Sequence, residues 1–130
     1  MSSESLHAPR ERLTKATLSM HHAIVSLMEE LEAADWYRQR ADDSEDDSLR
    51  EILLHNMREE MEHASMLIEW IRRNNTDFAG HLKTYLFTTA PITEVEKAAE
   101  GKVGGNASAG GGASSGDGGF TIGALKDKKD

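Results

Sequence analysis

The chain has 130 residues, no cysteine and a net charge of −8, from 23 acidic and 15 basic residues. This length allows one compact domain at most, and the lack of thiols excludes disulfides, thiolate metal sites and cysteine nucleophiles. The acidic balance argues against nucleic acid and anionic membranes as partners, and it suits cations. Residues 1–7 contain no apolar run, so we expect neither a signal peptide nor a membrane span, and we predict a cytoplasmic protein.

A first helix is predicted over residues 11–40. Its apolar residues recur every three or four positions, as on one buried helix face: Leu13, Ala16, Met20, Ile24, Leu27, Met28, Leu31 and Ala34. Glu30 lies three residues after Leu27 and four before Ala34, so a carboxylate projects at or beside this stripe. No basic residue is obviously matched to that carboxylate.

A second helix is predicted after a polar break at residues 41–48 that is rich in helix-capping residue types. Its amphipathic segment covers residues 49–71, Arg72 and Arg73 lie in its last turn, and it stops at Asn74-Asn75. Its apolar stripe consists of Leu49, Ile52, Leu53, Met57, Ala64, Leu67, Ile68 and Ile71. The short break predicts an antiparallel hairpin of the two helices, in an all-α fold. Shorter helices are expected over residues 78–87 and 93–101.

Two polar residues, Glu60 and His63, fall on the apolar stripe of the second helix. A lone buried carboxylate normally stays protonated or finds a positive partner, and this stripe offers no Lys or Arg. A Glu-x-x-His spacing places an oxygen and a nitrogen ligand on neighbouring turns, and it is half of the motif that di-iron carboxylate bundles use. Two interpretations therefore stay open: a metal site, or a Glu60–His63 pair at the edge of the stripe that is bonded within itself or to water.

A single chain offers only half of such a site. One protomer supplies one extra Glu and one Glu-x-x-His, whereas a di-metal carboxylate site needs two of each. Two helices also leave one apolar face uncovered, and a second hairpin would cover it. A two-fold dimer would thus complete the core and the site by the same contact.

The C-terminal part of the chain differs in composition. Residues 101–119 contain most of the 11 glycines, and this composition predicts a flexible linker. Residues 120–130 begin with an apolar cluster that includes Phe120, Ile122, Gly123 and Leu125. A short apolar peptide on a flexible tether is typical of a docking tag.

Several runs of the sequence closely resemble the encapsulated ferritins. They are residues 23–40, then His55-Asn56 with Glu59-Glu60-x-Glu62-His63-Ala64, and, later, Leu82-x-Thr84-Tyr85-Leu86-Phe87 and Pro91-Ile92. The resemblance covers roughly residues 7–95. The tail is similar to the peptides that load cargo into encapsulin shells.

The resemblance implies a half-ferritin helical domain over residues 1–100, which forms a four-helix ferritin-like bundle by dimerisation and assembles as a decameric ring. The activity it implies is that of a ferroxidase, which oxidises Fe(II) to Fe(III) with dioxygen and supplies iron for storage inside an encapsulin nanocompartment. Residues 120–130 would then be the targeting tail that binds the encapsulin shell protein.

The same matching implies roles for individual residues. Glu30, Glu60 and His63 from two chains would bind a di-iron centre, with Tyr37 beside it. Glu29, Glu32 and Trp36 would belong to a secondary metal site, for which calcium is another candidate. An ordinary solvated acidic face stays the alternative for Glu29 and Glu32, and a packed phenol is the alternative to an electron donor for Tyr37.

Three other classes of protein are alternatives to the ferroxidase. Helical zinc hydrolase motifs need two His on one helix, and this helix has Glu at the position of one of them. Relatives of the rubrerythrins normally carry both Glu-x-x-His motifs on one chain, unlike this sequence. A non-catalytic helical cargo or adaptor protein, tethered to a shell by its tail, stays the leading alternative.

Overall fold

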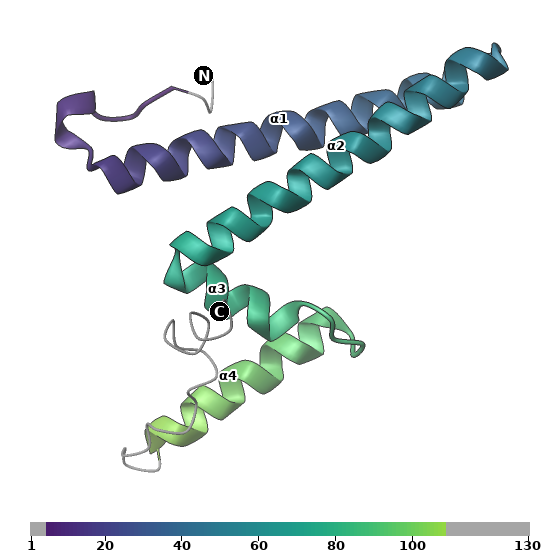
Figure 1. Cartoon of the computed structure of the whole chain (residues 1–130). Helices are drawn as coiled ribbons and strands as arrows, with labels where there is room; N and C mark the ends of the chain where they lie inside the picture. The colour runs from purple at the N-terminus through teal and green to yellow at the C-terminus, as the bar shows by residue number, and fades with distance from the viewer. Residues whose placement is uncertain (1–4, 109–130) are drawn as a thin grey trace, which may run out of the picture. The chain divides into compact units, whose positions relative to one another are not determined.

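The computed structural model of the chain describes residues 5–108, with residues 102–108 as backbone only. Helices are the only regular secondary structure in this part of the chain, which confirms the predicted all-α fold. Its elements are η1 (Arg10–Arg12), α1 (Lys15–Asp43), α2 (Asp47–Asn74), α3 (Thr76–Tyr85) and α4 (Ile92–Ser108) (Figure 1). They fall into two compact units that divide after Ile71. Within residues 5–108, no helix combines the length and the apolar content of a transmembrane span.

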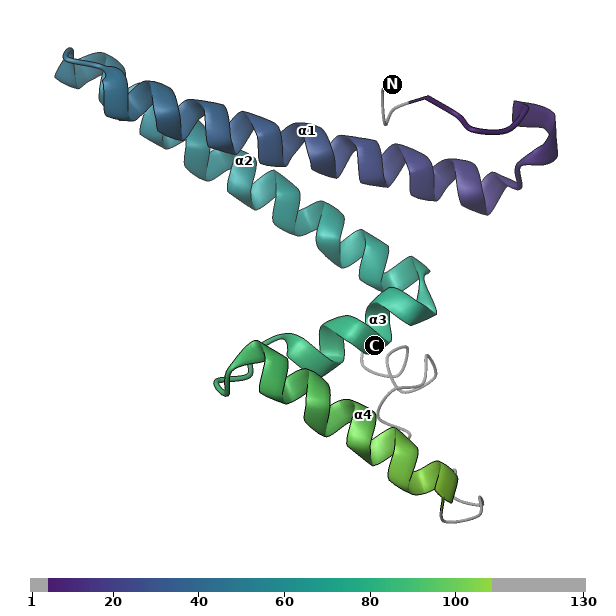
Figure 2. The same ribbon diagram turned by 180° about the vertical axis from the view of Figure 1, so that it is seen from behind.

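The first unit is the antiparallel hairpin of α1 and α2, which lie close together near their turn and diverge away from it in both views (Figures 1 and 2). Its turn is only residues 44–46, shorter than the polar break predicted over residues 41–48. Ala41 is fully buried, so the last turn of α1 belongs to the packed part of the hairpin. The predicted hairpin is therefore present, with a tighter turn than its composition indicated.

Asp46 caps the start of α2. Its Oδ1 accepts hydrogen bonds from the backbone N–H groups of Ser48 (2.9 Å) and Leu49 (3.2 Å) and from the Ser48 hydroxyl (2.7 Å). The Ser48 hydroxyl and these two N–H groups lower the pKa of Asp46, because they stabilise the charged carboxylate. The first N–H groups of a helix have no partner within it, so this carboxylate satisfies two of them.

The first helix begins later than predicted. The expected start near residue 11 is wrong, because α1 begins at Lys15 and the short η1 precedes it. Leu13 is extended, with ψ 139°, and separates the two helices. Thr14 then caps α1 by accepting a hydrogen bond from the Thr17 N–H (3.0 Å).

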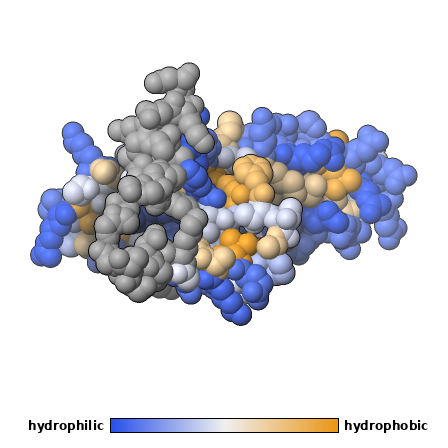
Figure 3. Space-filling model, turned by 90° about the horizontal axis from the view of Figure 1, so that it is seen from below, coloured by the Kyte–Doolittle hydropathy of each residue, from blue (hydrophilic) through white to orange (hydrophobic). Residues whose placement is uncertain are grey.

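The interior of the hairpin is small. Its buried apolar residues are Ala23, Ala41, Met57, Ala64 and Ile71. Among the described residues, no large side chain is fully buried. Many members of the two predicted stripes stay exposed in one protomer: Ile24, Met28, Leu31, Leu49, Ile52 and Ile68. Figure 3 shows apolar residues reaching the surface between hydrophilic ones, so a single protomer covers only part of its apolar face.

The second unit contains α3 and α4, which contact each other. The third helix was predicted over residues 78–87, and both ends are corrected by the structure. Asn75 caps α3 by accepting a hydrogen bond from the Phe78 N–H (2.8 Å), so the helix begins at Thr76. It ends at Tyr85, because Leu86 is extended and Phe87 adopts a φ of 64°, which cannot continue a right-handed helix.

The fourth helix is longer than predicted. It begins at Ile92, where the Glu94 and Val95 N–H groups donate to the Pro91 carbonyl (2.9 and 3.0 Å). The predicted end at Gly101 is wrong, because α4 continues to Ser108. Glycine weakens a helix by about 1 kcal/mol relative to alanine without forbidding it, so glycine content alone does not end a helix. The predicted division into residues 1–100, 101–119 and 120–130 stays a prediction.

Candidate metal centre

Three potential metal ligands meet in the middle of the hairpin. Glu30 comes from α1, and Glu60 and His63 come from α2. One ligand atom from each lies within 4.8 Å of the other two. His63 Nδ1 is 3.0 Å from Glu60 Oε1 and 3.6 Å from Glu30 Oε2. Residues 30 positions apart in the chain thus share one small space.

Packing of the hairpin explains this position. Met57, one turn before Glu60, and Ala64, directly after His63, are both buried. Helical spacing then keeps Glu60 and His63 next to each other on α2. The side chains of Glu30, Glu60 and His63 are 27%, 22% and 42% exposed, respectively, so the group is half-buried and open to ions from solution.

Hydrogen bonds and a short polar contact connect the three side chains. A hydrogen bond between the two carboxyl groups raises the pKa of Glu30 and lowers that of Glu60, so Glu30 is the more easily protonated of the two. The hydrogen bond from His63 to Glu60 raises the pKa of His63, and the nearby Glu30 adds to this effect. The two carboxylates therefore attract positive charge to this point of the hairpin.

The donor set fits a divalent transition metal. Two carboxylates and one imidazole are ligands that Fe(II) accepts, and a metal would compete with protons for their ligand atoms. Within the described side chains, this is the one group of three His, Asp or Glu residues close enough to hold an ion. The structure therefore brings Glu30, Glu60 and His63 together as the sequence predicts, and their role as ligands stays a prediction.

The residues expected at a secondary metal site do not form a comparable group. Glu29 and Glu32 are exposed on α1, and no third ligand joins them among the described side chains. Trp36 is 47% exposed on the same helix. A secondary site at these residues stays a prediction, as does the targeting role of Phe120, Ile122, Gly123 and Leu125, which lie outside the described residues.

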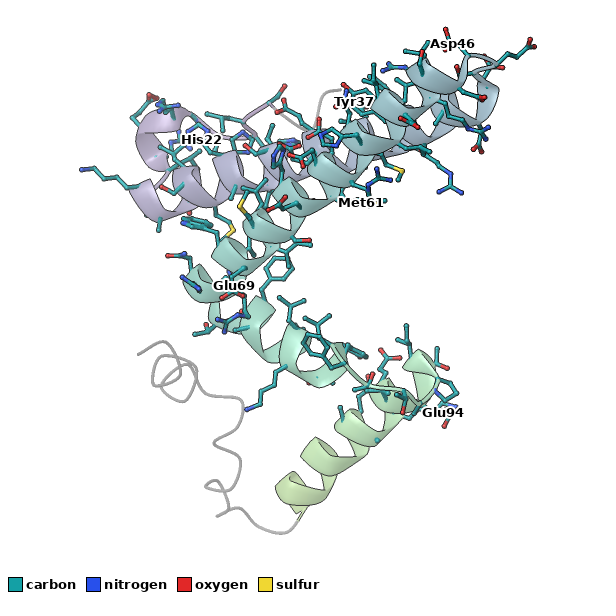
Figure 4. All side chains as sticks on the ribbon, turned by 45° about the vertical axis from the view of Figure 1, so that its right-hand side comes forward. His22, Tyr37, Asp46, Met61, Glu69 and Glu94 are labelled. Carbon is teal, nitrogen blue, oxygen red and sulfur yellow. The ribbon has the colours of Figure 1, made fainter. Side chains whose placement is uncertain are left out.

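Tyr37 lies on α1, between the middle of the hairpin and the turn that carries Asp46 (Figure 4). The sequence interpretation missed its neighbour Arg40, whose guanidinium carbon is 5.6 Å from the centre of the Tyr37 ring. The same carbon is 5.7 Å from the centre of the Trp36 ring. The signal was present in the sequence, because an Arg placed three and four residues after two aromatic residues shares a helix face with both.

Comparison with known proteins places the chain in a family. The EncFtn-like family model matches residues 5–89. An encapsulated ferritin-like protein from Rhodospirillum rubrum is 53% identical over 126 residues, which cover 96% of this chain and 90% of that protein. A ferritin-like protein from Thermotoga maritima is 47% identical over 98 residues, which cover 75% and 86% of the two chains.

A solved structure shows the same likeness in three dimensions. The crystal structure of a protein from Nitrosomonas europaea aligns with a TM-score of 0.66 and 51% sequence identity, covering 68% of this chain and 97% of that one. The family match spans both long helices and all three residues of the candidate metal centre. The chain belongs to the EncFtn-like family, and its function is ferritin-like and iron-related.

Proposed function

We propose that this protein is a ferroxidase that oxidises Fe(II) to Fe(III) with dioxygen at a di-iron site shared between two copies of the chain. The observation that carries the proposal is the convergence of Glu30, Glu60 and His63 within 4.8 Å on a half-buried face. Membership of a ferritin-like family supports iron as the metal.

Sharing between two copies follows from the ligand count. One protomer offers two carboxylates and one imidazole, and a di-iron carboxylate site uses four carboxylates and two imidazoles. A two-fold axis beside the group would bring a second identical set to the first. Exposed apolar side chains of the same hairpin, such as Ile24, Met28 and Leu31, would be covered by that contact. We infer a dimer of hairpins as the functional unit, assembled further into a decameric ring.

The roles of the residues follow from their chemistry. The carboxylates of Glu30 and Glu60 would balance the charge of Fe(II), and His63 would bind it as a neutral imidazole. Fe(II) would compete with protons for the same ligand atoms. Fe(II) is the substrate, each ion gives up one electron, and dioxygen accepts the electrons. Anionic oxygen ligands favour the Fe(III) product.

The destination of the iron rests on the relatives. The curated relative from Rhodospirillum rubrum is named an encapsulated ferritin-like protein. By analogy, we propose that this chain works inside an encapsulin nanocompartment, that residues 120–130 bind the shell protein, and that the Fe(III) is stored there. Glu29, Glu32 and Trp36 would collect cations near the di-iron site, with calcium as another possible occupant.

The test is an anaerobic titration of the metal-free full chain with Fe(II), followed by native mass spectrometry and then by oxygen uptake. Wild-type protein should bind one iron per chain, and only in assemblies with an even number of chains. Glu60→Gln should weaken iron binding by at least about tenfold and abolish rapid oxygen uptake, because it removes a ligand charge without changing size. Glu59→Gln is the matched control, since it removes the same charge from an exposed neighbour and should behave as wild type.

A different result would favour the alternative. If dimers form and no iron binds, or if Glu60→Gln and Glu59→Gln behave alike, Glu60 and His63 are a structural pair. The non-catalytic cargo or adaptor role would then be the better description of this chain.

A further inference from the structure

One cation lies beside two aromatic rings near the candidate metal centre. The Arg40 guanidinium carbon is 5.7 Å from the centre of the Trp36 ring and 5.6 Å from that of the Tyr37 ring. Both distances are within the range of about 6 Å at which a guanidinium is attracted to the electron-rich face of a ring. A single side chain therefore contacts two neighbouring aromatic residues at once.

Other polar residues on this stretch of α1 pair differently. Arg38 lies 3.6 Å from Asp42, and the Gln39 amide donates a hydrogen bond of 3.0 Å to Asp35. Those contacts are between exposed polar side chains one turn apart. Arg40 instead has the rings of Trp36 and Tyr37 as its neighbours, so Arg38 is a natural control for the charge of Arg40.

The positive charge of Arg40 affects how easily these rings lose an electron. A guanidinium stays positively charged throughout the working pH range. Removing an electron from a ring beside a fixed positive charge is less favourable than removing it from an isolated ring, because the attraction between cation and ring is lost. Arg40 therefore makes the oxidation of both rings more difficult.

Both rings lie close enough to the candidate metal centre to meet oxidants formed there. Tyr37 follows Glu30 by seven residues, which is about 10 Å along the helix axis. Trp36 is 47% exposed, so diffusing oxidants can reach it. Under the proposed function, dioxygen is reduced nearby. Hydrogen peroxide that escapes would take one electron from Fe(II) and split into hydroxide and hydroxyl radical, and this radical is a one-electron oxidant of indole and phenol rings.

We propose that Arg40 is a positioning residue that holds the rings of Trp36 and Tyr37 and protects them from one-electron oxidation beside the metal site. The proposed function supplies only the source of the oxidant. In the reaction that Arg40 opposes, the oxidant takes one electron from the ring. The Trp36 indole then becomes a radical cation, whereas the Tyr37 phenol also gives its proton to water and becomes a neutral radical. Arg40 protects Trp36 more strongly, because the indole product keeps its positive charge next to the guanidinium.

The experiment uses metal-free full-length protein and azide radical, a one-electron oxidant generated by pulse radiolysis. Oxidised Trp36 is quantified by peptide mass spectrometry relative to Trp70, and oxidised Tyr37 relative to Tyr85. In Arg40→Gln, the ratio for Trp36 should rise by about two- to fivefold, as expected for loss of an exposed cation–π contact. The rise for Tyr37 should be smaller. Arg40→Lys should stay close to wild type because it keeps the charge, and Arg38→Gln should leave both ratios unchanged.

Two outcomes would overturn the proposal. One is an Arg40→Gln ratio equal to that of wild type. The other is an Arg40→Lys variant as sensitive as Arg40→Gln, which would show that ring coverage, and not charge, is what matters. Because no iron is present, a chain without ferroxidase activity would still show the expected difference, so failure of the proposed function and failure of this inference are distinguishable.

Discussion

Glu60 links the other two residues of the candidate metal centre. Its carboxylate is hydrogen-bonded to Glu30 on the other helix and to His63 on its own. The pKa values of Glu30 and His63 are raised by these neighbours, so both side chains favour a positive charge at the place where a cation would bind. A site built in this way is organised before any metal arrives.

We expect the His63 imidazole of metal-free protein to titrate above its ordinary value of 6.5, because the hydrogen bond to Glu60 favours the charged ring. Since the folded pKa is raised, the stabilisation from this contact is complete below pH 6.5 and is lost as the pH rises through the raised value. NMR titration of the histidine ring signals would measure it. Glu60→Gln should bring the His63 titration back toward its ordinary range.

The matched control for that titration is Glu59→Gln, which should leave the His63 midpoint in place. A wild-type midpoint at or below 6.5 would contradict the hydrogen bond as described. Metal binding needs the neutral imidazole, so it should tighten with increasing pH through the same midpoint.

The α1–α2 turn determines which residues of the two long helices face each other. Only three residues connect α1 to α2, and Asp46 holds the start of α2 through three hydrogen bonds. A turn this short sets the register between the helices, which in turn places Glu30 opposite Glu60 and His63. The geometry of the metal centre therefore depends on the turn that Asp46 caps.

Asp46→Ala should lower the thermal midpoint of the metal-free protein at neutral pH by roughly a few degrees, as loss of a helix cap does in a small domain. The folded pKa of Asp46 is lowered, so its stabilisation is present above its ordinary value of 3.8 and is lost as the pH falls through the folded value. The difference from wild type should therefore shrink in acid. Calorimetry across pH would measure both effects.

Asp46→Asn tests the same cap without the charge. An Asn side chain caps a helix about as well as Asp, so this variant should keep most of the stability at neutral pH. A loss as large as that of Asp46→Ala would show that charge, and not the capping hydrogen bond, stabilises the turn.

The described part of the protomer exposes large apolar side chains that the sequence pattern assigns to a protein core. Leu31 is 53% exposed and Ile52 is 56% exposed, although both belong to the predicted core stripes. The buried residues of the hairpin are mostly small, so the protomer has little core of its own. A partner hairpin would cover this surface, as the proposed shared site also requires.

Leu31→Glu should break the assembly into smaller species that keep their helices. Burying a leucine is worth about 1.5–3 kcal/mol, and a charge in its place adds a desolvation cost, so association should weaken by at least about tenfold for each copy. Size-exclusion chromatography with light scattering would give the mass, and circular dichroism the helicity. Iron binding should fall together with the assembly.

Leu6→Glu is the control, because Leu6 is also exposed and lies before the helical hairpin. It should leave the mass unchanged. An intact assembly in Leu31→Glu would show that the α1 face around Glu30 is not a contact between copies, and the shared di-iron site would have to be abandoned.

Local patterns predicted much of this chain correctly. The spacing of apolar residues located both long helices and their antiparallel order, because each helix repeats a side-chain direction every three to four residues. Helix ends were predicted less well, since they depend on single capping bonds such as those of Thr14, Asn75 and Asp46. The end of α4 was missed because glycine lowers helix stability without preventing the helix.

The candidate metal centre shows the same division between local and long-range information. The proximity of Glu60 to His63, and of Arg40 to Trp36, follows from helical spacing and could be read from the amino-acid sequence. The approach of Glu30 to His63 across the hairpin could only be suspected, because it depends on the register that the turn and the buried alanines impose. The same packing decided which carboxyl has the higher pKa, since that depends on distances between atoms of two different helices.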